Sequence, residues 1–204
     1  MLVIGLTGGM GMGKSSAAAH FRNRGIPVFD ADSYVHALYE GAAVPAIEAA
    51  FPGTTRGGRV DRAQLSKEIA GQPERLRQLE AIVHPLVIQA EIDFLCDEEA
   101  KGTRIVVLDI PLLFETGAET RVDTTIALST SERVQRDRVL ARPGMTMETF
   151  EALRARQLSD AERRARADHV VDGGSALENL HAQLDRLIES LQTREGAVMD
   201  RLRR

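Results

Sequence analysis

The residues from Gly8 to Ser15 constrain the fold most strongly, because their sequence is Gly-Gly-Met-Gly-Met-Gly-Lys-Ser and they directly follow the apolar run 2–6. Four glycines and one lysine within eight residues match the phosphate-loop pattern Gly-x-x-x-x-Gly-Lys-Ser. The apolar run predicts a buried strand, and residues 15–25 predict a helix that ends at Gly25. A strand that leads through such a loop into a helix is typical of an α/β fold with a parallel sheet.

The same loop predicts a chemistry. Glycines allow successive backbone N–H groups to turn inward toward phosphate oxygens, and the positive end of the following helix faces the same anion. Lys14 adds a charge for the β- and γ-phosphates, and the Ser15 hydroxyl is placed to coordinate Mg²⁺. We therefore predict a nucleotide site formed by Gly8, Gly9, Gly11, Met12, Gly13, Lys14, Ser15 and Ser16. A glycine-rich turn without a ligand is the alternative.

Further apolar runs predict the rest of the sheet, at 27–30, 104–109, 122–129 and 168–174. Helical patterns separate these runs, so the fold class is α/β, with a three-layer core and a five-stranded parallel sheet. The helical stretch between the second and third runs is too long for one crossover. We expect it to form a helical lobe over residues 33–100, within a single domain of residues 1–204.

Local signals refine this outline. Pro85 should kink or break the helix of the lobe and push His84 out of the helical region. Ser175 and Glu178 form a Ser-x-x-Glu pattern, which predicts a capping box for the last long helix. Residues 41–58 show loop signals, and the tail 193–204 is expected to fray.

Composition excludes several classes of protein. The formal net charge of −4 argues against general nucleic-acid binding, and no apolar run approaches the roughly 18 residues that a membrane span needs. The single cysteine, Cys96, cannot form an internal disulfide and points to a reducing, cytoplasmic setting. The sequence leaves the oligomeric state open between a monomer and a weak homo-oligomer.

Several segments, in order, resemble the dephospho-CoA kinase family: residues 4–16, 28–38, 79–87, 106–115, 135–142, 156–157 and 167–174. The most specific are Ile-Val-His-Pro, ending at Pro85, and Asp-Ile-Pro-Leu-Leu-Phe-Glu, residues 109–115. The Asn-Lys-x-Asp motif of GTPases, the Asp-Gly-Phe-Pro-Arg motif of adenylate-kinase-like enzymes and the Gly-Gly-Gly turn of shikimate kinases are missing from the sequence. Another small-molecule P-loop kinase and a non-catalytic nucleotide-binding module remain the alternatives.

The resemblance implies a phosphotransferase that uses ATP and Mg²⁺. Enzymes of this family transfer the γ-phosphoryl group to the ribose 3′-hydroxyl of dephospho-CoA, which completes coenzyme A. Asp32 would accept the proton of the attacking hydroxyl or orient it, although a helix N-cap is a competing and compatible role. Asp30 is a weaker candidate, because it could simply cap the helix or bind a loop.

The resemblance also implies an acceptor site. Asp109 ends a buried strand, where a carboxylate needs a partner, and looks like the Walker B position that binds Mg²⁺ or orients the acceptor. A structural hydrogen bond is its alternative role. His84 and Pro85 are expected beside the acceptor, and Leu113, Phe114 and Glu115 are expected as walls of its site.

An arginine-rich segment follows. Residues 133–166 contain nine arginines and five acidic residues, a local charge of +4, which alone would indicate only a solvated helix face. In P-loop kinases the matching segment is a lid, so we expect a lid over 136–166, with Arg142 on the γ-phosphate and Arg138 in support on one helix face. The family often has arginine where Leu153 stands, and Arg154 or Arg156 is the available substitute.

Overall fold

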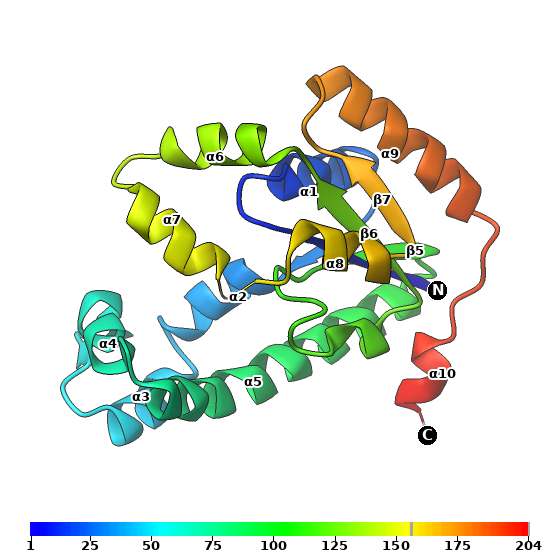
Figure 1. The fold of residues 1–204 in the computed structure, drawn as a ribbon. Coiled ribbons are helices and arrows are strands. Elements are labelled where there is room, and N and C mark those ends of the chain that lie inside the picture. Colours follow the sequence, from blue (N-terminus) through cyan, green and yellow to red (C-terminus); the bar gives the residue numbers. More distant parts are fainter. Residues whose placement is uncertain (156, 204) are drawn as a thin grey trace. The chain divides into compact units, whose positions relative to one another are not determined.

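The computed structural model describes residues 1–155 and 157–203. Its main sheet has the strand order β2-β5-β1-β6-β7. The strands are β1 (Leu2–Gly8), β2 (Val28–Asp30), β5 (Ile105–Asp109), β6 (Thr124–Ser129) and β7 (His169–Asp172). Strand β1 pairs in parallel with β5 and with β6, and β6 pairs in parallel with β7. This five-stranded parallel sheet between helices (Figure 1) confirms the predicted fold class.

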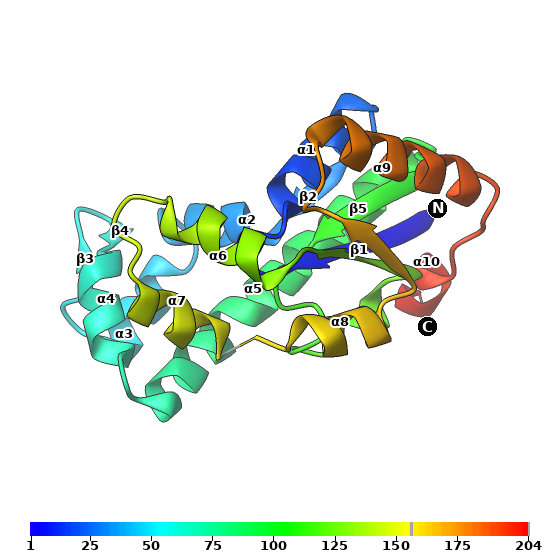
Figure 2. The ribbon, with the colours of Figure 1, turned by 45° about the horizontal axis from the view of Figure 1, so that its top comes forward.

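The core forms around β1, in which all seven residues are buried. Helices α1 (Lys14–Asn23) and α9 (Leu177–Leu191) lie on one face of the sheet, and α8 (Asp160–Arg166) lies on the other (Figure 2). One apolar cluster joins β1 to α1 and α9, and it includes the fully buried residues Leu6, Phe21 and Leu184. This packing fixes the start of α1 at the end of β1.

A charged contact ties α1 to α9. The Asp185 carboxylate accepts a hydrogen bond from Arg24 Nε at 2.7 Å and hydrogen-bonds His20 Nε2 at 2.8 Å. His20 is buried, and its ring stacks on that of His181 with 4.2 Å between centroids. The hydrogen bonds from Arg24 and then His20 lower the pKa of Asp185 from 3.8 to about 2, against the smaller opposing effect of burial.

The described chain divides into two compact units. One comprises Met1–Phe29 and the described residues from Leu95 onward, and the other comprises Asp30–Phe94. The second unit contains α2 (Ala31–Leu38), α3 (Val44–Ala50), the hairpin β3 (Thr55–Arg56) and β4 (Arg59–Val60), α4 (Arg62–Ile69) and most of α5 (Pro73–Ala100). It has its own apolar cluster, with Ile47, Phe51 and Leu65 nearly or fully buried. The expected lobe 33–100 overlaps this unit, and its binding of an acceptor stays a prediction.

Within the first unit, the arginine-rich segment forms three helices: α6 (Glu132–Leu140), α7 (Met147–Arg154) and α8. A tight turn separates α6 from α7, because the Met145 N–H donates to the Arg142 carbonyl at 3.2 Å. Pro143 and Gly144, with φ at 75° for the glycine, suit the two central positions of a type II turn. The 3₁₀ helix η1 (Ala118–Arg121) lies earlier in the same unit.

The expected break at Pro85 is wrong. Helix α5 runs through it from Pro73 to Ala100, and His84 lies inside the helix. A proline costs an α-helix about 3 kcal/mol, but buried apolar residues lie on both sides of it, Val83 before and Ala90 after. Burying both halves favours the continuous helix.

The capping box predicted for α9 is also wrong. The N-cap is Ala176, which makes no side-chain cap, and the Ser175 hydroxyl instead donates to the Asp172 carbonyl at 3.2 Å. Ser175 therefore closes the turn after β7 rather than starting the helix.

The tail does not fray as expected, because residues 198–202 form α10 (Val198–Leu202). The Asp123 carboxylate accepts hydrogen bonds from the backbone N–H groups of Ala197 and Val198 at 2.7 and 3.0 Å, and from that of Val3 at 2.9 Å. Val198, the first residue of α10, is buried. One carboxylate thus holds the segment before α10 and the start of β1.

Among the described helices, none has the length and apolar character to cross a membrane.

The lowered pKa of Asp185 predicts an acid-sensitive contact. Because the folded pKa lies below the unfolded one, the stabilisation is complete above about pH 4 and disappears as the pH falls through the folded value near 2. We expect Asp185→Asn to lower the free energy of unfolding at pH 7 and to have less effect at pH 3, measured by urea denaturation. Asp97→Asn, at an exposed position of α5, is the control. A loss that is equal at both pH values would contradict the prediction.

Candidate functional site

The loop after β1 takes a shape that requires glycine. Gly11 has φ at 78° and Gly13, the N-cap of α1, has φ at 96°, where residues with a Cβ are strained. The Met12 N–H donates to the Gly9 carbonyl at 3.1 Å, and the Met12 side chain is buried in the core. The Met12 side chain therefore anchors the loop to the core, and the backbone of the loop is the part that can face a ligand.

Helix α6 holds this loop from the side. Gln135 Nε2 donates to the Met10 carbonyl at 2.9 Å. Arg138 donates to the Gly173 carbonyl at 2.6 Å and lies 3.4 Å from that of Gly11. A Cβ at Gly11 would meet a Val139 methyl group at 2.7 Å. Arg138, predicted to support the γ-phosphate, thus binds backbone carbonyls here and braces the loop. Gln135 was not predicted as a site residue.

Lys14 and Asp109 are brought together. Lys14 is the first residue of α1, and its Nζ lies 2.5 Å from Asp109 Oδ1 at the end of β5. The side chain of Lys14 is 16% exposed and that of Asp109 only 4%. The lysine therefore places a positive charge beside a carboxylate that strand β5 buries.

The hydroxyl groups of Ser15 and Ser16 lie on the exposed first turn of α1. In the described part of the chain, no three His, Cys, Asp or Glu residues gather as a metal site. Mg²⁺ keeps several waters and takes one or two protein ligands together with substrate phosphates. An exposed Ser15 hydroxyl, and Asp109 at the neighbouring strand end, fit such a partial site.

The expected pairing of Arg138 and Arg142 on one helix face is wrong, because α6 ends at Leu140. Arg142 lies in the exposed turn before α7, and its guanidinium has no hydrogen-bond or ion-pair partner among residues 1–155 and 157–203. Arg154, a possible substitute for the missing lid arginine, forms an ion pair with Glu132. Arg156, the other substitute, lies outside the described residues.

The segment after β5 is more deeply packed than expected of an acceptor wall. Leu113 is fully buried beside Gly5, and Phe114 is 4% exposed with the Arg166 guanidinium 4.9 Å from its ring centroid. Glu115 Oε1 accepts a hydrogen bond from the Leu158 N–H at 2.8 Å. Leu113 and Phe114 are therefore packed in the core, and their role as walls of an acceptor site stays a prediction.

The second unit contains the other predicted residues. Asp30, not Asp32, is the N-cap of α2, and its carboxylate accepts the Ser33 N–H at 2.9 Å. Asp32 lies in the first turn, exposed, and its carboxylate accepts no hydrogen bond within the described chain. His84 and Pro85 are exposed on α5.

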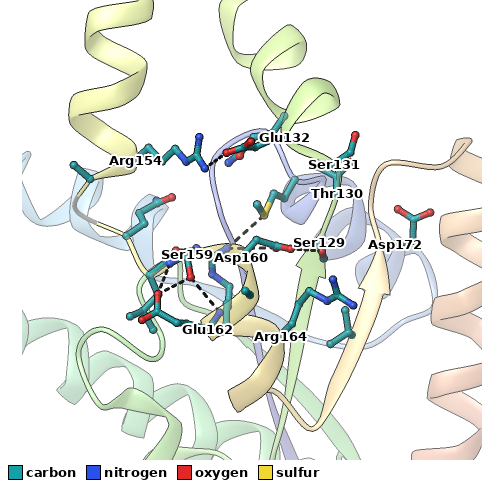
Figure 3. A pocket seen from close by; sticks show the side chains of 18 of the residues that line it. Ser129, Thr130, Ser131, Glu132, Arg154, Ser159, Asp160, Glu162, Arg164 and Asp172 are labelled. Carbon is teal, nitrogen blue, oxygen red and sulfur yellow. Dashed lines mark hydrogen bonds and ion pairs between the residues drawn. The ribbon is translucent and has the colours of Figure 1, made fainter.

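An open cavity of about 1240 Å³ lies between the ends of β6 and β7 and helices α6–α8. Figure 3 shows Asp160 of α8 pointing to Ser129 at the end of β6, and their side chains are 2.8 Å apart. Met12 of the loop and Arg163 also line the cavity. Arg163 is only 2% exposed, and sequence reasoning did not separate it from the exposed arginines of the segment.

Comparisons with known proteins point to one family. The family model described as dephospho-CoA kinase matches residues 2–179. The dephospho-CoA kinase of Rhodopseudomonas palustris (strain ATCC BAA-98 / CGA009) is 52% identical over 190 residues, which cover 93% of this chain and 96% of the relative. The dephospho-CoA kinase of Brucella melitensis is 49% identical, and the match covers 97% of this chain and 99% of the relative. The crystal structure of TT1252 from Thermus thermophilus is similar with a TM-score of 0.81 and 36% identity, covering 93% and 97%.

The loop geometry gives a second prediction. Gly11→Ala adds a Cβ at a positive φ and against Val139, so we expect about 1–3 kcal/mol of strain and at least a roughly tenfold weaker binding of a non-hydrolysable ATP analogue, measured by calorimetry. Gly53→Ala is the matched control, since its φ is 80° but a Cβ there meets nothing within 4 Å. Unchanged binding by Gly11→Ala would show that the loop is not the nucleotide site.

Proposed function

The chain belongs to the dephospho-CoA kinase family, and we propose that its phosphate loop, Asp32 and the segment from α6 to α8 carry out the reaction of that family. The protein is a phosphotransferase that transfers the γ-phosphoryl group of ATP to the ribose 3′-hydroxyl of dephospho-CoA, which gives coenzyme A and ADP. Phosphoryl transfer depends mainly on positioning and on stabilising charge, so the proposal assigns those tasks to particular residues.

The phosphate loop binds the polyphosphate of ATP through backbone N–H groups at the start of α1. The positive φ of Gly11 and Gly13 supports this role, because it turns the backbone inward where a Cβ would clash or strain. Lys14 then exchanges its contact with Asp109 for the β- and γ-phosphates. The short Lys14–Asp109 distance means that the lysine is already held near the end of the loop before ATP arrives.

Ser15 and Asp109 hold Mg²⁺ together with the phosphates and with water. When bound, the ion would neutralise negative charge that develops on the phosphoryl group during transfer. Asp109 would contribute its carboxylate to the ion when Lys14 moves to the phosphates.

Asp32 orients the acceptor hydroxyl and receives its proton. Its position two residues after the end of β2 supports this role, because ligands of parallel α/β sheets bind at the carboxyl ends of the strands. Asp30 already caps α2, so Asp32 is not needed for that hydrogen bond. His84 and Pro85, exposed on α5, are further candidates for contacts to the acceptor.

Arg142 contacts the γ-phosphate, while Arg138 braces the loop. The exposed and unpaired guanidinium of Arg142 in the described chain supports this division, because forked N–H donors match phosphoryl oxygens. We further propose a cytoplasmic protein without nucleic-acid partners, in agreement with the net charge of −4 and the free Cys96.

The single observation that carries the function is the similarity to dephospho-CoA kinases over more than nine-tenths of the chain, with the phosphate loop in place. The direct test measures ADP release from Mg-ATP with and without dephospho-CoA, with the product mass checked. We expect one added phosphate on dephospho-CoA. Turnover with only another acceptor would mean a different small-molecule kinase, and ATP binding without turnover on any acceptor would favour a binding module.

The two neighbouring aspartates allow a matched comparison. We expect Asp32→Asn to lower kcat by about 100- to 10,000-fold, the range for loss of a group that moves or orients a reacting proton. Asp30→Asn should stay within about twofold, because asparagine is an equally good N-cap. Both variants are measured by coenzyme A formation at saturating ATP. Equal losses, or a larger loss for Asp30→Asn, would overturn the assignment of Asp32.

A further inference from the structure

The backbone of Leu158, between α7 and α8, is held on both sides by charged side chains. Its N–H donates to Glu115 Oε1 at 2.8 Å, and its carbonyl accepts from Arg163 Nη2 at 2.7 Å. Glu115 comes from the segment after β5, and Arg163 comes from α8. Two groups distant in sequence thus fix the residue at which the arginine-rich segment returns to the core.

Arg163 extends this contact to the phosphate loop. Its Nη1 lies 3.4 Å from Met12 Sδ, and a Cβ built on Gly9 would lie 3.2 Å from the same nitrogen. The Arg163 guanidinium is therefore packed against the phosphate loop at Gly9 and Met12. It also lies 3.9 Å from Asp160, whose other oxygen accepts the Ser129 hydroxyl.

Burial makes this arrangement costly, which argues for a role. The Arg163 side chain is 3% exposed, and an arginine in a protein does not lose its charge. Its Nε and Glu115 Oε2 are both buried and have no hydrogen-bond partner among the described residues. Buried charges with incomplete hydrogen bonding destabilise a fold by several kcal/mol. Hydrophobic residues would fill the space more cheaply, so stability alone does not account for the pair.

We propose that Glu115 and Arg163 are positioning residues that clamp Leu158, where α7 leads into α8 within the lid, to the phosphate loop. This inference rests on the proposed function. The clamp fixes one end of the part of the lid that can move, α7 and the turn before it, so that Arg142 returns to one place over the γ-phosphate. It replaces the role of acceptor wall that the sequence predicted for Glu115.

The clamp and the acceptor wall predict different kinetics. Loss of a clamp misplaces the lid, so kcat falls while KM for dephospho-CoA changes little, and more ATP is hydrolysed without phosphorylation because the closed site excludes water less well. Loss of a wall raises KM for dephospho-CoA and leaves kcat nearly unchanged. The ratio of ADP to coenzyme A formed is therefore the informative quantity.

The variants separate the hydrogen bond from the charge. Glu115→Gln retains an oxygen that can accept the Leu158 N–H, so we expect kcat within about threefold of wild type. Glu115→Ala should lower kcat by about 10- to 100-fold, the size of a small misplacement at a reacting centre. Arg163→Met, which keeps much of the side-chain volume, should give the same signature. Glu119→Ala is the control, because Glu119 accepts from Arg166 in the same region but does not contact Leu158.

Amide hydrogen exchange tests the clamp independently of turnover. The Leu158 N–H should exchange slowly in the wild-type protein and in Glu119→Ala, and at least tenfold faster in Glu115→Ala. Were the protein inactive on dephospho-CoA, this measurement would still decide whether the clamp exists, so the two proposals fail separately. Fast exchange in wild type, a raised KM with unchanged kcat in Glu115→Ala, or an equal loss of kcat in Glu119→Ala would each overturn the clamp.

Discussion

The burial of β1 between two parallel neighbours is the constraint on which the rest of the structure depends. Every residue of the strand is buried, and its backbone pairs with β5 on one side and β6 on the other. After β1 the chain must turn beyond the end of the sheet. The loop glycines allow this turn because they have no side chain that would need space there. The Lys14–Asp109 pair, the brace from Arg138 and the packing of Met12 all follow from where β1 ends.

The sequence was sufficient wherever the signal is local. The five apolar runs became the five strands, and the phosphate-loop pattern lies between β1 and α1. Each of these depends on the conformational preferences of a few neighbouring residues. Such preferences are present in the chain before any long-range contact forms.

The failed expectations depend on partners that are distant in sequence. Pro85 does not break α5, because residues on both sides of it are buried. Asp123 orders a tail whose composition predicts fraying. The charge of the arginine-rich segment also gave a wrong picture of its arginines, because they lie in different environments. Arg163 is buried, Arg154 forms an ion pair and Arg138 binds carbonyl groups. Arg142 is exposed and lies beyond the end of the helix that was expected to contain it. No count of arginines separates these four environments.

The contact at Asp123 also changes how the order of the chain should be understood. Val3 and Ala197 bond to the same carboxylate, and a Cβ on Gly196 would collide with the Met1 carbonyl, so the segment that leads into α10 contacts the first residues of the chain. The first and last described segments of the chain are therefore neighbours in the fold, although they are the farthest apart in sequence. A short linker could join these ends, and a new start could be opened at an exposed glycine turn, such as Gly57–Gly58, without moving β1 from the centre of the sheet.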